Sequence, residues 1–267
     1  APRDALYHYE RGLTQLVAHA FRASERSFDT ALSLDPELIE AHLYKTVLYV
    51  SWLGDRQAAN AELLMLEEKV GLDTLMQIVL QPGLWGFFTW LEGELPLALA
   101  DWDVTESGGD PAAWHFAMAE LAQRAGRDDE ARRHYAAAVP YREAAVAAAP
   151  GDPWLNAELG IALAGAGDAA AAVAAADRAV AIAPVSKDPW SNTDFLWLRA
   201  TVLQMLGRED EAIRQIAEAA RYPGTITPVT LDVEPLWAPL FEREAFRALI
   251  DDSGRAWRVG PVAAADP

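Results

Sequence analysis

Acidic side chains occur in close pairs along the chain, and paired carboxylates are the groups that glycoside hydrolysis uses. A glycosidase needs two carboxylates in unlike environments that face each other across a cleft. Most of the pairs here fall at turns or in the first turn of an expected helix, where helix capping and the helix dipole already favour acidic residues. We therefore predict no catalytic residues and no enzyme, with a helical carbohydrate-active enzyme based on Asp101 or Asp103 as an alternative. The pairs are Asp101 and Asp103 around Trp102, Glu67 with Glu68, Asp128 with Asp129, and Glu242 with Glu244.

Histidine is the second residue type that could carry chemistry, as a metal ligand. His8 and His42 are 34 residues apart, which is the spacing of the helical repeat described below. His115 falls at the same position in a later repeat. Equivalent residues of neighbouring helical repeats lie roughly 10 Å apart, whereas a zinc ligand lies about 2.1 Å from the ion. These histidines cannot share one metal, so we expect them to pack between helices. The chain has no cysteine, and we predict no metal site and no cofactor.

Composition and charge exclude several classes of partner. The 267 residues are 52% hydrophobic, and 40 Asp and Glu against 22 Lys and Arg give a net charge of −18. Nucleic acids and anionic membranes bind mainly through cations, so we expect neither nucleic-acid binding nor membrane insertion of this chain. The compartment stays open between cytoplasm and periplasm. The chain begins at Ala1 and not at a Met. This start is consistent with the removal of an upstream signal, anchor or domain.

A helix–turn–helix pattern that recurs about every 34 residues organises the chain, and it is clearest over 153–186. Small residues there let two antiparallel helices approach closely, Gly167 permits the turn between them, and Pro184 ends the second helix. This spacing resembles the tetratricopeptide repeat (TPR). The resemblance implies an all-α fold, a right-handed superhelical solenoid of about six helix pairs with a C-terminal capping helix. The matching residues are Leu159, Gly160, Leu163, Gly167, Ala172, Ala176, Ala179 and Pro184.

The repeat pattern divides the chain into an array over 1–224 and a C-terminal extension. Pro82-Gly83 should break the first helix of the third unit, and Pro140 lies inside an overlong second helix of the fourth. Residues 225–252 are expected to form an extended linker and a capping helix, followed by a loosely ordered tail over 253–267. The predicted units span about 5–38, 39–72, 73–111, 112–152, 153–186 and 193–226.

The stretch from 184 to 250 carries a second resemblance. Its Leu231-Asp232-Val233-Glu234-Pro235-Leu236-Trp237 run, followed by Phe246, is similar to the end of the TPR region in bacterial multidomain proteins. Those proteins carry cyclase, winged-helix regulator or serine/threonine kinase domains before the repeats. Ala238 stands where those families have Asp. The resemblance implies a bacterial signalling or scaffold role and supplies no enzyme.

Ten tryptophans are the most unusual feature of the composition after the charge. The TPR resemblance implies that the first helix of each unit lines a concave groove, and an aromatic groove suits an extended or helical apolar segment. We predict a non-catalytic interaction, sensing or scaffold module that binds a protein or peptide of apolar or basic character. A small-molecule-binding regulatory domain with a pocket near Pro82-Gly83 is the other alternative, and the oligomeric state stays open. The predicted groove residues are Tyr9, Leu43, Phe87, Trp90, Phe116, Trp154, Trp197, Gln204 and Met205.

Overall fold

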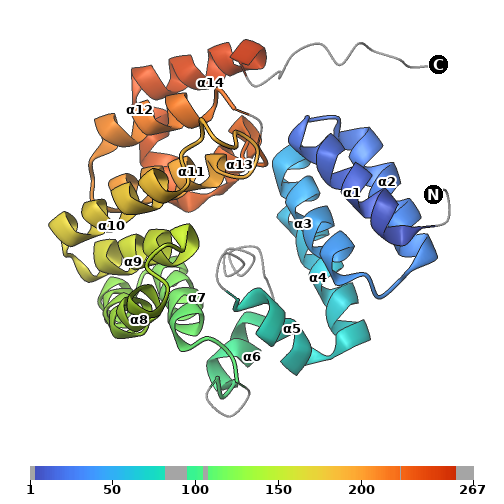
Figure 1. The fold of residues 1–267 in the computed structure, drawn as a ribbon, viewed down its shortest axis with the longest axis horizontal. Helices are drawn as coiled ribbons and strands as arrows, with labels where there is room; N and C mark the ends of the chain where they lie inside the picture. The colour runs from blue at the N-terminus through green and yellow to red at the C-terminus, as the bar shows by residue number, and fades with distance from the viewer. Residues whose placement is uncertain (1–3, 82–94, 105–107, 223, 257–267) are drawn as a thin grey trace. The chain divides into compact units, whose positions relative to one another are not determined.

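The computed structural model describes residues 4–81, 95–104, 108–222 and 224–256, and every regular element in these ranges is a helix (Figure 1). Two compact units divide the chain: unit 1 comprises residues 1–71 and 220–267, and unit 2 comprises residues 72–219. The α-helices are α1 (Ala5–Val17), α2 (Phe21–Leu34), α3 (Ile39–Leu53), α4 (Arg56–Val70), α5 (Leu72–Val79), α6 (Leu95–Asp101), α7 (Pro111–Arg124), α8 (Asp128–Ala148), α9 (Pro153–Ala166), α10 (Ala169–Ile182), α11 (Thr193–Met205), α12 (Glu209–Ala219), α13 (Pro228–Val233) and α14 (Glu244–Ala256), with the 3₁₀ helix η2 (Pro235–Glu242) between the last two.

Consecutive helices pack as hairpins, and the hairpins stack in chain order within each unit (Figure 1). In unit 1, α1 pairs with α2, α3 pairs with α4, and α2 packs on α3. In unit 2, the pairs are α7 with α8, α9 with α10, and α11 with α12. The first helices of neighbouring pairs also touch, α1 with α3 and α9 with α11. This is the arrangement of a TPR-like helical stack, as predicted.

Glycine closes the turn inside most helix pairs. Gly54, Gly126, Gly167 and Gly207 have φ angles of 64°, 69°, 98° and 69°. L-residues with a side chain adopt this left-handed conformation at a cost, whereas glycine does so freely. The α1–α2 turn differs, because His19 takes the equivalent conformation with φ 56°. The turns therefore explain why glycine recurs between the two helices of a pair.

Small residues set the close approach of paired helices. A Cβ placed on Gly160 of α9 would come within 3.1 Å of the Ala172 carbonyl oxygen in α10. The core of unit 2 is correspondingly rich in alanine around a few large side chains, which include Phe116, Tyr135 and Ile161. Because the backbones approach so closely, short side chains fill the interface at native packing density.

The structure also shows where the sequence pattern and the helices differ. Helix α5 ends at Val79, before Pro82-Gly83, which lie outside the described residues. Helix α8 runs without a break through Pro140 for 21 residues. The expected extended linker is wrong from Pro228 onward, because α13 and η2 are helical. Thr227 and Thr230 form a capping box, and Pro228 occupies the first turn, where its fixed φ favours a helix.

Candidate functional site

Two of the predicted groove residues lie in unit 1, and both are buried. The ring of Tyr9 in α1 lies between Phe28 and Tyr44, at centroid distances of 6.3 and 6.0 Å. Burial raises the pKa of the Tyr9 hydroxyl, and the neighbouring Tyr44 adds to the shift. Leu43 in α3 is also buried. Packing between helices accounts for both side chains in this conformation.

In unit 2 the predicted groove residues divide into buried and partly exposed groups. Phe116 is completely buried between Tyr135 and the guanidinium of Arg142. Trp197 and Gln204 of α11 are buried as well. Trp154 of α9 and Met205 of α11 are partly exposed. Phe87 and Trp90 lie outside the described residues. Only Trp154 and Met205 therefore offer substantial surface to a partner among the described members of the set.

Two features of α11 distinguish it from an ordinary packing helix. The side chain of Gln204 is buried, yet its Oε1 accepts no hydrogen bond within the described part of the chain. Such an acceptor lacks its usual partner at a cost of about 1–3 kcal/mol. In the first turn of the same helix, burial raises the pKa of the Asp194 carboxyl to about 6. The helix thus carries two polar groups that its own fold leaves poorly solvated.

Among the predicted histidines, His42 and His115 contact side chains of the following helix, and His8 in α1 is half-buried. Nδ1 of buried His42 lies 2.6 Å from Oε1 of Glu62 in α4, and Nε2 lies 3.1 Å from the Pro36 carbonyl oxygen. Nδ1 of His115 in α7 lies 3.0 Å from Nδ1 of His134 in α8. Burial lowers the pKa of both members of this second pair. Within the described residues, no cluster of three or more His, Asp and Glu side chains is arranged to hold a metal ion.

Several buried charges are not evident from the sequence pattern. Glu62 receives Lys45 at 3.3 Å in addition to His42. Arg142 lies in the interior of unit 2, with Nη1 2.8 Å from Asp110 and Nε 2.7 Å from Glu158. These ion pairs connect successive helices, and within the described residues Nη2 of Arg142 is buried without a hydrogen-bond partner. The one available signal is that each stands among apolar residues on its own helix.

The two carboxylates of the enzyme alternative, Asp101 and Asp103, are both exposed. Trp102 between Asp101 and Asp103 is buried, and its indole N–H donates to Asp73 at 2.9 Å. Asp128 and Asp129 stand in the first turn of α8. Together with Glu130 they place three acidic residues at the positive end of that helix, where the helix dipole stabilises them.

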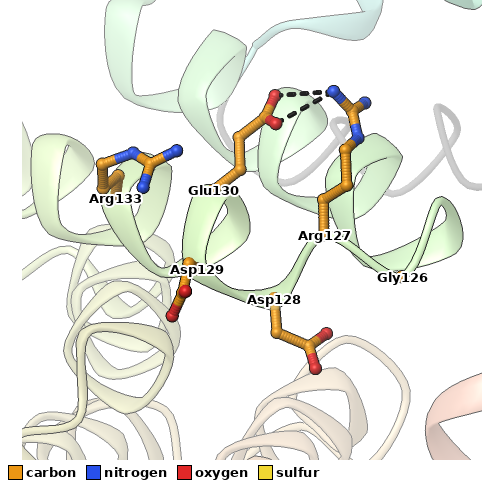
Figure 2. A pocket seen from close by; sticks show the side chains of 6 residues that line it. All are labelled: Gly126, Arg127, Asp128, Asp129, Glu130 and Arg133. Carbon is orange, nitrogen blue, oxygen red and sulfur yellow. Dashed lines mark hydrogen bonds and ion pairs between the residues drawn. The ribbon is translucent and has the colours of Figure 1, made fainter.

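The same turn contains an open hollow of about 570 Å³, shown in Figure 2. Arg127 spans part of it with two contacts to Glu130, of 2.9 and 3.1 Å. Because the acidic side chains already neutralise the helix end, the hollow offers an anion little unpaired positive charge. We assign no site to it. The lining residues are Gly126, Arg127, Asp128, Asp129, Glu130 and Arg133.

The most site-like arrangement lies in unit 1, where residues 224–233 run along the end of α3. Ser51 Oγ donates to the Thr225 carbonyl oxygen at 2.6 Å, and Thr227 Oγ1 donates to the Ser51 carbonyl oxygen at 2.7 Å. Nε2 of His19 lies 3.0 Å from the Gly224 carbonyl oxygen. Arg56 Nη1 reaches the Val233 carbonyl oxygen at 3.4 Å. Helix α13 then packs on α3. A repeat helix here holds an extended segment and the helical turn that follows.

Comparisons with known proteins add little beyond the helices themselves. No protein-family model matches the sequence, and no curated protein matches it. One solved structure that it resembles is the crystal structure of the P58(IPK) TPR domain. The alignment has 13% sequence identity and a TM-score of 0.26, and it covers 94% of this chain. This chain spans 64% of that chain's length.

The helix pairs, their turns and the repeat spacing define a TPR-like helical repeat protein. None of its described helices is long and apolar enough to cross a membrane.

Proposed function

We propose that this protein is a non-catalytic scaffold that binds a protein or peptide segment along the first helices of its pairs. The observation that carries the proposal is the contact of residues 224–233 with α3. Three hydrogen bonds reach backbone carbonyl oxygens of the segment, from Ser51 of α3, from His19 in the α1–α2 turn and from Arg56, the first residue of α4. Contacts to the backbone give affinity for an extended chain, and pockets for its side chains add selectivity. Unit 1 therefore holds one of its own segments through contacts to backbone, and this supports the proposal.

Helices α9 and α11 supply a second surface of the same kind. The indole of Trp154 meets the Phe195 ring edge-on at 5.0 Å, so its orientation is fixed while part of it stays exposed. Rigid aromatic side chains of this sort are typical anchors for a partner. Gln204 Oε1 is buried and so does not contact a partner in this conformation. The proposed contact residues in unit 2 are Trp154, near the start of α9, and Met205, at the end of α11.

The net charge of −18 adds a condition on the partner. Acidic residues around an apolar surface attract a basic segment and repel an acidic one, mainly through the association rate. A partner with an apolar anchor and flanking cations therefore suits the unit 2 surface best. Its association should slow as ionic strength rises.

Selection of a displayed random peptide library on the full chain tests the proposal. Apolar peptides with basic flanks should be enriched, and Trp154→Ala should weaken their binding at least tenfold, as loss of a central anchor does. Trp190→Ala is the matched control, because Trp190 is 40% exposed but lies before α11. Circular dichroism establishes that both variants fold. The proposal is wrong if no peptide is enriched, or if the two substitutions weaken binding equally.

A further inference from the structure

Residues 224–233 are held in unit 1 by polar contacts to their backbone and by the burial of three of their side chains, Thr227, Thr230 and Leu231. His19, Ser51 and Arg56 contact the carbonyl oxygens of Gly224, Thr225 and Val233. Thr227 is the exception, because its hydroxyl donates to the Ser51 carbonyl oxygen and also caps α13. This pattern is that of a receptor surface and an extended ligand that turns into a short helix.

His19 is set in an unusual conformation that serves this contact. The equivalent turns in later pairs carry glycine, but His19 adopts φ 56° with a full side chain. Its ring stacks on Phe21 at 5.4 Å, and Phe21 stacks on Trp52 at 6.1 Å. The stack fixes the imidazole with Nε2 at the Gly224 carbonyl oxygen. A residue in a less favourable conformation is retained here where it contacts the segment.

Gly54 leaves room for apolar side chains of the same segment. A Cβ at this position would come within 2.8 Å of Val233 and 3.2 Å of Val229. No such neighbour approaches Gly126, which closes the corresponding turn of the α7–α8 pair. Leu231 is buried, so the helical turn presents Leu231, Val229 and Val233 as its apolar contacts. The surface therefore selects apolar side chains at fixed distances after Thr227.

We infer that this surface is a recognition site for Thr-Pro-led apolar segments, which residues 224–233 occupy as an intramolecular ligand and from which an external segment of the same pattern displaces them. The surface comprises His19, Ser51, Gly54 and Arg56. The inference rests on the proposed scaffold function and specifies the partner and the regulation of one site.

The chemistry of the occupying segment describes the partner. The segment from Gly224 to Val233 carries no Lys or Arg, and its single charge is Asp232. An external ligand of this site is therefore uncharged or weakly acidic, with an extended lead, a Thr-Pro pair and an apolar residue four positions after the Thr. A tethered segment competes at an effective concentration of order mM. Such a partner binds weakly until the tethered segment is released.

The test uses a fluorescently labelled synthetic peptide of residues 224–234 and the full-length chain. Leu231→Asp in the chain places a charge at a buried position and expels the segment without altering the receptor surface. Thr227→Ala weakens the segment more mildly, by removing one hydrogen bond and the helix cap. We expect weak peptide binding by the native chain, roughly tenfold tighter binding by Thr227→Ala, and still tighter binding by Leu231→Asp. Adding Ser51→Ala to Leu231→Asp should reverse the gain, and a peptide with Ala in place of Thr227 should bind less well.

Each result decides the inference. It is overturned if neither folded release variant binds the peptide better than the native chain does, or if both variants lose the cooperative unfolding transition, since the segment is then part of the core. Dimers of the native chain that exchange 224–233, detected by gel filtration and cross-linking, would make a second copy the occupant and also overturn it. If library peptides bind the release variants while the 224–234 peptide does not, the inference fails and the scaffold function stands. If neither binds, both fail.

Discussion

The guanidinium of Arg142 lies 2.7 Å from the carboxylate of Glu158, and both side chains are almost completely withdrawn from water. Its other contact, at 2.8 Å, is to Asp110, whose second carboxylate oxygen caps α7. One arginine of α8 thus connects the start of α7 with the interior of α9. The contact is an ion pair in the packed interior rather than a solvated surface bridge, so its loss leaves charges with no access to water.

We predict that Arg142→Met destabilises unit 2 by about 3–5 kcal/mol, because Glu158 is left as an uncompensated buried charge. Urea unfolding followed by circular dichroism measures the change. Arg132→Met on the same helix is the control, since Arg132 is exposed and its replacement should cost less than about 0.5 kcal/mol. Combining Arg142→Met with Glu158→Met should recover part of the loss. Equal stability of the two single variants would contradict the assignment.

Buried charges such as Arg142 show where sequence reasoning reaches its limit. The turns at Gly54, Gly126, Gly167 and Gly207 could be predicted, because a left-handed turn demands glycine at a fixed place in each repeat. An arginine in a long helix, in contrast, is expected to face water, and its partners here lie on two other helices. Periodicity describes one helix at a time and carries no information on such partners.

The predicted aromatic groove shows a related limit. In a tightly stacked repeat the first helix packs on several sides, so an apolar ring on it can lie in the core or in a groove. Tyr9 and Phe116 are core residues, whereas Trp154 stays partly exposed. Tyr9 and Phe116 each stand fifth in their predicted units, whereas Trp154 stands second in its own, so the three rings meet different neighbours. The helix at Pro228–Val233 was missed for a different reason, because its β-branched residues resemble an extended strand and the Thr227–Thr230 cap outweighs them.

The pH dependence of stability should reveal the His115–His134 pair. Burial, the largest cause for both, lowers their pKa values; His134 further lowers that of His115, and for His134 Glu130 opposes the shift while Arg133 and Arg127 reinforce it. The unfolded state then takes up protons below about pH 6.5 before the folded state does, so the free energy of unfolding falls as pH falls from about 7 to 5.

Replacing both histidines with Gln should reduce the change in the free energy of unfolding between pH 7 and pH 5 by about 0.5–1 kcal/mol. This value is reduced because both side chains are partly exposed. Urea unfolding at a series of pH values measures it. A slope that persists in the double variant would assign the pH dependence to other groups.

Asp194 should give the opposite pH dependence, in which the free energy of unfolding falls as pH rises. Burial raises its pKa to about 6, so the folded state holds the proton between the unfolded value of about 4 and 6. The stabilisation that this provides is complete below the unfolded pKa and is lost as pH rises through 6. Asp194→Asn should therefore raise the free energy of unfolding at pH 7 by roughly 1 kcal/mol, allowing for its partial exposure, and should give no gain at pH 4.

Gly54 and Gly126 provide a matched pair of substitution sites that tests how closely α13 packs at the end of α3. Their φ angles are 64° and 69°, so an alanine at either site meets the same left-handed strain of about 1–2 kcal/mol. Only at Gly54 would the new Cβ also meet Val233 and Val229. Gly54→Ala should thus destabilise the chain more than Gly126→Ala does, by about 1 kcal/mol or more, as overpacking of a filled site does. Hydrogen exchange should place the difference at residues 224–233, because these must shift to admit the methyl group. The prediction is contradicted if both alanine variants lose the same stability and the amides of 224–233 exchange as in the native chain. Val233 would then pack less closely against Gly54 than the 2.8 Å approach requires.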